Sequence, residues 1–396
     1  MPTKSFDRKF LESLLSQPTA PFCEHWVART VITELKRNQV PHFVDPVGNI
    51  VLGVGGEAEY RKRLAMPSPE PVRVFLAHMD HPGFHGVSWG KKGALKVKWL
   101  GGGTPKKFLK GAKVFLADRK AWQGTGVLTK PKWGSKGQVL ESAEINCDEP
   151  ELMKRFPNAA DIFGGFGFKK PVWAKGSILY TKAADDLIGV FTLVSLAIRL
   201  NQPGAVGAED FVAVLTRGEE VGFVGAIGHI ELGWLQKAKR QIYLVSLETS
   251  RTLPGAIVGE GPVVRLGDRA TVFTPGAVQI LQSVAQKLLP GKFQRRVMDG
   301  GTCEATVGVT YGIASLGISI PLGNYHNLSY EGGPESRGKM GPGPEFVSLN
   351  DLAGMMVLCD GLMEPKLGWS NPWVVRQQKF REGQAIYEGL IREFVL

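Results

Sequence analysis

From Asp185 onward, segments of helical periodicity alternate with short, nearly continuous apolar segments. Residues 185–200, 277–289 and 349–363 have the helical pattern, and residues 210–216, 241–248 and 314–322 have the strand pattern. Residues 225–238 also favour a helix. Apolar strands that alternate with helices usually form a parallel sheet covered on both faces. The chain is therefore predicted to be an α/β protein with a mostly parallel central sheet flanked by helices.

The first half of the chain has two kinds of sequence pattern. Helical patterns at 9–16 and 24–37 precede strand patterns at 42–54 and 72–78. After Gly90, short alternating strands are separated by Gly, Pro and Lys, and no long helical pattern returns until about Asp185. This indicates a small β-barrel inserted at residues 88–180. Residues 1–87 and 181–396 would then form the two parts of one catalytic domain.

Charge and hydropathy narrow the range of partners. The net charge is +11, and thirteen Lys or Arg but one acid, Asp118, lie between Lys91 and Lys136. Such a stretch is either a solvated surface or an attractor of nucleic acid, anionic lipid or an acidic substrate. No nucleic-acid-binding motif accompanies it, so a nucleic-acid partner is not expected. No apolar stretch is long enough to span a membrane, and the N-terminus lacks a signal-peptide core, so we expect a cytoplasmic protein.

Metal-binding residue types stand at the predicted strand ends. His78 and Asp80 follow one strand, Glu219 and Glu220 another, and Glu248 and His326 two more, while Asp185 and Asp186 begin a helix. Ligands of open α/β sheets bind at the carboxyl ends of the strands. Each residue alone has an ordinary explanation, such as a helix cap or a solvated turn. Their coincidence at every internal strand end favours a metal site.

Two imidazoles and several carboxylates suit one or two divalent cations such as zinc. Five ligands suit two cations with one bridging carboxylate, and Asp185 at a helix start is a natural bridge. Asp80 can accept a hydrogen bond from His78 and fix its tautomer. Because Glu219 and Glu220 are consecutive, one can bind metal while the other acts as a general base.

These residues resemble the glutamyl aminopeptidase group of metallopeptidases, which includes the tetrahedral aminopeptidases. The resemblance rests on His78-x-Asp80, "KAADDLIGV" (182–190), "RGEEVGFVGA" (217–226), the strand end at Glu248 and the late His326. It extends to "DPVGNIVLGV" (45–54), the barrel stretch from "GGGTPKKFLKGAKVF" to "GTGVL", "GEGPVVRLGDRA" (259–270) and "MDGGTCEATV" (298–307). It therefore covers nearly the whole chain.

The resemblance implies a role for each site residue. His78, Asp185 and Glu248 would bind one metal ion, and Glu220 and His326 would bind a second that Asp185 bridges. Glu219 would be the general base, and Asp80 the partner of His78. The implied function is hydrolysis of N-terminal peptide bonds by a water activated by two metal ions, zinc or else cobalt or manganese. A peptide substrate and a homo-oligomer built with the barrel, an oligomerisation or lid domain, are expected with it.

Three departures from the family pattern leave the substrate open. His81 stands where the family usually has an acid, and Glu248 replaces the usual Asp. The segment after His326 is longer and richer in Gly and Pro than the family's link. Two alternatives therefore remain. One is a related dinuclear hydrolase of N-acyl or C-terminal amides, and the other is a basic binding protein on the same scaffold. The basic stretch also suggests an acidic substrate.

Overall fold

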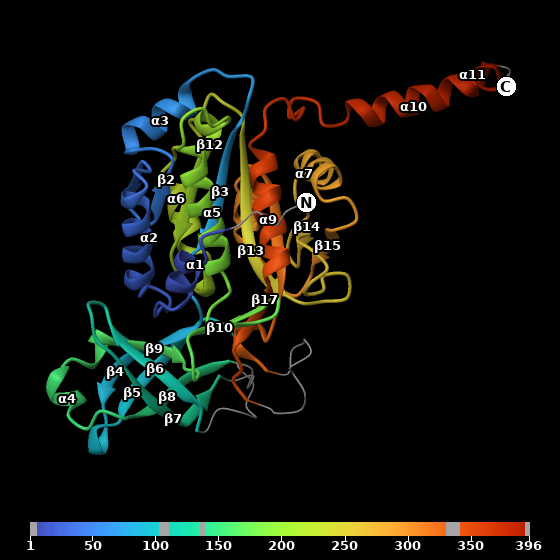
Figure 1. Ribbon diagram of the computed structural model, residues 1–396. Coiled ribbons are helices and arrows are strands. Elements are labelled where there is room, and N and C mark those ends of the chain that lie inside the picture. Colours follow the sequence, from blue (N-terminus) through green and yellow to red (C-terminus); the bar gives the residue numbers. More distant parts are fainter. Residues whose placement is uncertain (1–5, 103–110, 135–138, 330–340, 393–396) are drawn as a thin grey trace.

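The computed structural model describes residues 6–102, 111–134, 139–329 and 341–392, which form an α/β body, a β-barrel and a C-terminal arm (Figure 1). The body is built on an eleven-stranded sheet, counted over these residues. Its main path runs in the order β1 (His42–Val44), β2 (Ile50–Leu52), β12 (Phe211–Thr216), β3 (Val72–His78), β13 (Ile242–Arg251), β16 (Ala314–Gly323), β17 (Glu345–Ser348), β11 (Ile178–Thr181) and β10 (Val172–Lys175). A branch adds β14 (Val263–Asp268), which pairs with β16 and with β15 (Gln294–Met298).

The parallel part of the sheet is its centre, where β12, β3, β13 and β16 lie side by side. Antiparallel strands extend both ends of this unit, so the whole sheet is mixed. All seven residues of β3 are buried, because alternate side chains enter the cores on the two faces. Val74 and Leu76 pack into one core, and Phe75 and Ala77 into the other. A strand covered on both faces explains the continuous apolar sequence of β3.

Helices cover both faces of the sheet. One core includes side chains of α1 (Arg8–Leu15), α2 (His25–Arg37), α5 (Leu187–Leu200), α7 (Pro275–Leu288) and α9 (Leu349–Leu362). The opposite core includes side chains of α3 (Glu57–Ala65), α6 (Val224–Glu231) and α8 (Glu304–Thr310). In α5, the central helix of the larger core, apolar residues occupy nearly every position, and eleven of its fourteen residues are buried. The predicted fold class is thereby confirmed.

The inserted module is a closed antiparallel barrel. Its strands follow the order β4 (Gly83–Trp89), β5 (Leu95–Leu100), β8 (Leu140–Cys147), β7 (Gln123–Trp133), β6 (Lys113–Asp118) and β9 (Ile162–Phe166). A short helix, α4 (Leu152–Arg155), precedes β9. In β5, Leu95, Val97 and Trp99 point into the barrel, while Lys96 and Lys98 are exposed. These lysines of the basic stretch therefore lie on the outer surface.

The barrel strands run from Gly83 to Phe166, whereas the predicted insertion covers 88–180. The prediction thus starts inside β4 and includes β10 and β11, which extend the large sheet through pairing of β11 with β17. The sequence pattern could not reveal this, because β10 and β11 are short strands like those of the barrel, and β11 pairs with a strand that begins only at residue 345.

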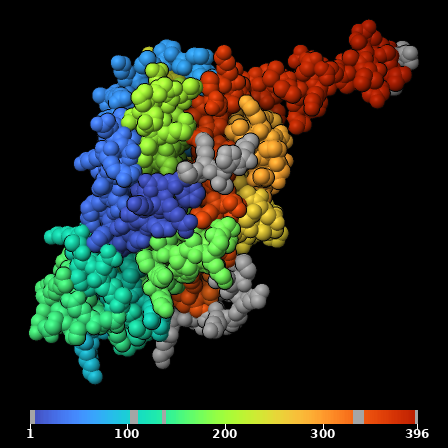
Figure 2. All heavy atoms as spheres, in the orientation of Figure 1, coloured from blue at the N-terminus to red at the C-terminus, as the bar shows by residue number. Residues whose placement is uncertain are grey.

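The chain ends in an arm of two helices, α10 (Val374–Ile386) and α11 (Glu388–Arg392). The arm projects beyond the body, and none of its helical residues is buried (Figure 2). Over the described residues, the model contains no helix with the length and hydropathy needed to span a membrane.

Candidate metal centre

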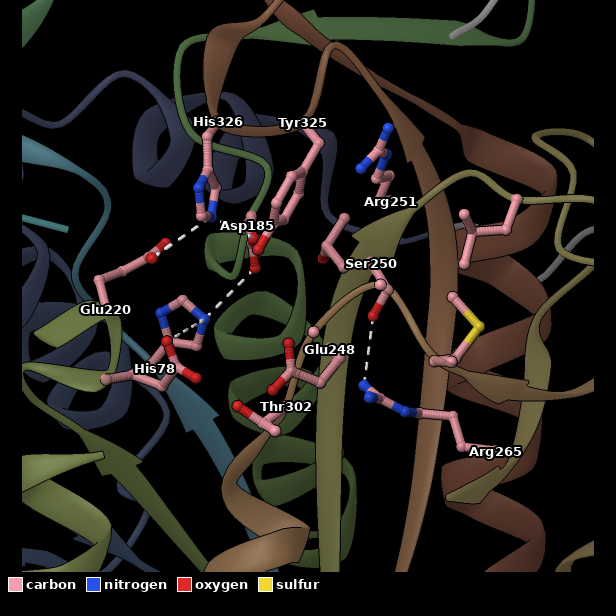
Figure 3. Close-up of a pocket in the computed structure, with 16 residues that line it drawn as sticks. His78, Asp185, Glu220, Glu248, Ser250, Arg251, Arg265, Thr302, Tyr325 and His326 are labelled. Carbon is pink, nitrogen blue, oxygen red and sulfur yellow. Dashed lines mark hydrogen bonds and ion pairs between the residues drawn. The ribbon is translucent and has the colours of Figure 1, made fainter. Parts of the chain in front are cut away.

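The predicted site residues come from the carboxyl ends of the parallel strands. His78 is the last residue of β3, and Glu219 and Glu220 lie in η4 (Glu219–Val221), just after β12. Glu248 lies in the second half of β13, and His326 lies in η5 (Tyr325–Asn327), just after β16. Asp185 precedes α5. Because β12, β3, β13 and β16 are neighbours, their ends bring these side chains into one pocket (Figure 3).

Asp185 lies between the two histidines. Its Oδ1 is 3.3 Å from Nε2 of His78, and its Oδ2 is 3.6 Å from Nε2 of His326. Nε2 of His326 is also 3.3 Å from Oε2 of Glu220. Each oxygen of Asp185 thus faces a different imidazole, an arrangement suited to a carboxylate that bridges two cations.

Glu219 and Glu248 complete the cluster. Oε2 of Glu219 is 3.8 Å from Nε2 of His78. Ligand atoms of His78, Glu219 and Glu248 lie within 4.8 Å of one another, as do those of His78, Asp185 and Glu220. These six residues line one small pocket, with a cavity volume of about 40 Å³. Sequence prediction therefore named six residues that share one pocket.

The charge balance of the pocket favours bound cations. Its lining has four carboxylates against two imidazoles and the guanidinium groups of Arg251 and Arg265. Oε1 of Glu220 and Oε1 of Glu248 are buried without a hydrogen bond from a described residue. Burial raises the pKa of Glu219 and Glu248 well above their usual values, since it disfavours the charged forms. Two divalent cations would balance this charge and supply partners for the free oxygens.

The histidines respond to the same carboxylates. Burial opposes protonation, yet the neighbouring carboxylates of Glu219 and Asp185 hold the pKa of His78 well above its usual value. Burial likewise opposes it in His326, but Glu220 and Asp185 raise the pKa of that imidazole to about 10. Without metal, protons on the imidazoles serve as the counter-charge. Metal binding would replace them.

Asp80 organises the site through the backbone. Its carboxylate accepts hydrogen bonds from the backbone N–H groups of Glu219 and Glu220, at 3.0 and 3.1 Å. Its Oδ1 lies 3.7 Å from Nδ1 of His78, while its own carbonyl oxygen is closer, at 3.1 Å. The hydrogen bond to His78 therefore comes from the backbone carbonyl of Asp80 and not, as predicted, from its carboxylate. The carboxylate instead fixes the turn that presents both glutamates.

Two further residues lie at the site, and the sequence analysis assigned a role to neither of them. Glu345 contacts the backbone of Asp185 and of His326. Arg265, from β14, lines the pocket and is 2% exposed. Neither follows a recognisable strand end, and each reaches the site through strands that the sequence prediction did not assign. His81, the departure from the family pattern, bonds through Nδ1 to the carbonyl oxygen of Asp185 at 2.7 Å.

A protein-family comparison matches the part of the chain that contains most of the predicted site residues. Residues 166–330 match the model of the M42 glutamyl aminopeptidase family. The predicted resemblance is confirmed. The matched segment includes five of the seven predicted site residues: Asp185, Glu219, Glu220, Glu248 and His326. His78 and Asp80 precede it. The match also confirms the prediction of a peptide-bond hydrolase.

Solved structures share the fold over most of the chain. An aminopeptidase from the archaeon Desulfurococcus kamchatkensis has a TM-score of 0.69 at 21% identity, over 91% of this chain and 95% of that one. A TET aminopeptidase from a marine sediment thaumarchaeon has a TM-score of 0.70 at 20% identity, over 90% and 96%. The TET1 peptidase of Pyrococcus horikoshii, which can assemble into a tetrahedron or an octahedral shell, has a TM-score of 0.67 at 20% identity, over 90% and 99%.

Proposed function

We propose that the chain is a metal-dependent aminopeptidase that removes the N-terminal residue of peptides. The observation that carries this proposal is the meeting of two imidazoles and four carboxylates around one pocket at the strand ends. The M42 family match supports the aminopeptidase reaction.

We infer that the pocket would hold two divalent cations. His78, Asp185 and Glu248 would bind one, and Glu220 and His326 would bind the other, with Asp185 shared. Zinc suits this mixture of imidazole and carboxylate ligands, and cobalt or manganese would also fit. When bound, such cations polarise a peptide carbonyl and make water easier to deprotonate.

Glu219 is assigned to the proton transfers. It is 9% exposed and lines the pocket, and its backbone N–H is fixed by Asp80. Its carboxylate would accept a proton from the attacking water and then donate it to the nitrogen of the leaving peptide. Burial raises the pKa of Glu219, which makes it a stronger base than an exposed glutamate.

We infer that acidic N-terminal residues are preferred, and the main support is Arg265. Its guanidinium is buried beside the pocket and donates to Oγ of Ser250 at 3.2 Å (Figure 3). Among the described residues, no carboxylate oxygen lies within 4.0 Å of it. A buried guanidinium gains most from a carboxylate partner, which an acidic side chain of the substrate would supply. Arg251 also lines the pocket.

Chelation tests the proposal. Protein stripped of metal should lose cleavage of aminoacyl p-nitroanilides, and zinc or cobalt should restore it. Elemental analysis should find about two ions per chain. Glutamyl and aspartyl substrates should turn over faster than alanyl ones. Full activity in the stripped protein would exclude the metal-dependent reaction, and preference for an N-acetylated dipeptide would favour the related amide hydrolase instead.

A homo-oligomer is proposed as the working form. The supporting observations are the fold shared with TET1 peptidase, whose structures are a tetrahedron or a shell, and with a second TET1 structure that is a dodecamer. Light scattering on the purified chain measures the mass directly. A monomer across the micromolar range would contradict the proposal.

A further inference from the structure

We propose that Glu345 is a positioning residue that holds the segments carrying Asp185 and His326 at the spacing that the second cation requires. The second cation is the one assigned to Asp185, Glu220 and His326. The inference rests on the proposed function, because it concerns the same metal centre. Glu345 itself contacts no substrate and acts through the backbone of two ligands.

A single buried carboxylate joins the two segments. Glu345 is the first residue of β17 and has no exposed surface. Its Oε2 accepts hydrogen bonds from the N–H groups of Ala184 and Asp185, at 2.7 and 3.1 Å. Its Oε1 accepts one from the N–H of His326, at 2.9 Å. The positions of the two ligands are thereby tied to each other through one rigid group.

The segment around His326 needs such a restraint. Asn324, His326 and Asn327 have φ angles of 58°, 52° and 61°, in the left-handed region. Asparagine tolerates this region, but for His326 it costs on the order of 1–3 kcal/mol and persists only where surrounding contacts determine it. The bond from His326 to Glu345 is one of these contacts.

Asn327 supplies a second restraint between the same segments. Its Nδ2 donates to the carbonyl oxygen of Lys182 at 3.0 Å, and its Oδ1 is 3.3 Å from Nε2 of His81. Nδ1 of His81 in turn bonds to the carbonyl of Asp185. The Asp185 segment and the His326 segment are therefore joined on two sides, by the carboxylate of Glu345 and by the bond from Asn327 to the carbonyl oxygen of Lys182.

The chemistry of the contact explains why a carboxylate occupies this position. Three N–H donors converge on two oxygens, and a carboxylate offers acceptors on both. A glutamine would offer one oxygen and place an NH₂ group against at least one donor, which leaves that donor without a partner. Burying a negative charge beside Asp185 is unfavourable. The three hydrogen bonds offset part of this cost, and cations bound at the site would offset more of it.

Metal titration of the full chain tests this role. Wild-type protein, Glu345→Gln and Asp351→Asn are stripped of metal and titrated with Co²⁺ in a calorimeter. Asp351 is the matched control, because it is also buried and accepts from the N–H groups of Gly259 and Gly261, at 2.7 and 2.9 Å, but does not line the pocket. We expect wild type and Asp351→Asn to bind two ions alike, and Glu345→Gln to bind the second about 10- to 100-fold more weakly.

Activity provides an independent readout. If Glu345 acts by retaining the second ion, excess Co²⁺ should restore most of the kcat of Glu345→Gln while KM stays near the wild-type value. Should Glu345→Gln fail to fold, Glu345→Asp keeps both acceptors on a shorter side chain, and we expect a smaller loss of affinity for the same ion. If a folded Glu345 variant binds both ions with wild-type affinity, the role of Glu345 is wrong, while the proposed function stands. Absence of metal binding in wild type removes the proposed function and this inference together.

Discussion

Glu219 and Glu220 are neighbours in sequence with different predicted tasks, and mutation can separate them. We expect Glu219→Gln to lower kcat by roughly 10²- to 10⁴-fold, because it removes the proton acceptor, while the metal content stays at the wild-type level. Glu220→Gln should instead lower the metal content, because this carboxylate faces His326. Turnover and elemental analysis of both variants measure the two effects. Loss of metal from Glu219→Gln would assign that residue to binding.

The buried carboxyl group of Glu304, the first residue of α8, should make the stability of the metal-free protein depend on pH. It has no exposed surface, and burial raises its pKa from 4.5 to about 7. The unfolded chain binds fewer protons than the folded one between these values, so this group makes the fold less stable as the pH rises from about 4.5 to 7. Well above pH 7 the buried charge costs on the order of 3 kcal/mol.

We therefore expect Glu304→Gln to stabilise the metal-free protein at pH 8 and to change it little at pH 4.5. Urea unfolding of both proteins at the two pH values measures this difference. Glu12→Gln, at a half-exposed side chain of α1 that pairs with Arg8, is the control and should change the stability by less than about 1 kcal/mol at either pH. Equal effects of Glu304→Gln at both pH values would contradict the pKa assignment.

At this scale, residue type and position were enough to predict which side chains meet. Imidazoles and carboxylates after apolar strands converge because parallel strands end at one edge of the sheet. The roles of Glu345 and Arg265 could not be predicted in this way. A carboxylate that accepts from the N–H groups of Asp185 and His326 leaves no local signature, since its partners are brought together only by β17 folding beside β16.

At the scale of elements, prediction succeeded where burial imposes a pattern. Strands β3, β12, β13 and β16 are apolar because both faces are covered, and α5 is apolar because it lies within the larger core. Elements with mixed surroundings were not predicted, among them β14, β15 and β17. Residues 330–340 of the Gly- and Pro-rich segment lie outside the described residues.

One contact between elements links the barrel to the metal centre. Gly102 follows β5, and a Cβ atom at this position would lie 1.9 Å from Nδ1 of His326. Gly102→Ala should therefore displace the imidazole, weaken metal binding about tenfold or more and lower kcat, while the barrel stays folded. Gly56→Ala is the control, because no atom lies within 4 Å of its Cβ position. Cobalt titration and circular dichroism check both variants, and unchanged metal affinity in Gly102→Ala would show that the barrel does not restrain His326.

At the scale of the whole molecule, the C-terminal arm stands out because the rest of the chain does not bury it. Its apolar side chains are largely exposed, including Val375 at 68%, Phe380 at 66%, Ile386 at 75% and Leu390 at 67%. A thirteen-residue helix with no buried residue is marginal in water. A partner that covers the arm would supply the missing packing, and the charge pattern along the arm favours a second copy of this chain.

The arm begins with the basic residues Arg376, Lys379 and Arg381, and the rest of the arm contains Glu382, Glu388, Arg392 and Glu393, which give that half a net negative charge. Antiparallel pairing of two arms would place the basic half of each against the acidic half of the other, with Phe380 of one copy near Tyr387 of its partner.

The centre of such a pair lies near Gln384. A cysteine introduced there should form a disulfide with the same residue of a second copy. One at Gln378 should not, because it lies six residues from the centre and about 120° around the helix. Non-reducing electrophoresis after mild oxidation, with light scattering on a chain truncated after residue 369, measures the pairing. Equal cross-linking at both positions, or an unchanged mass after truncation, would show that the arms do not pair in this way.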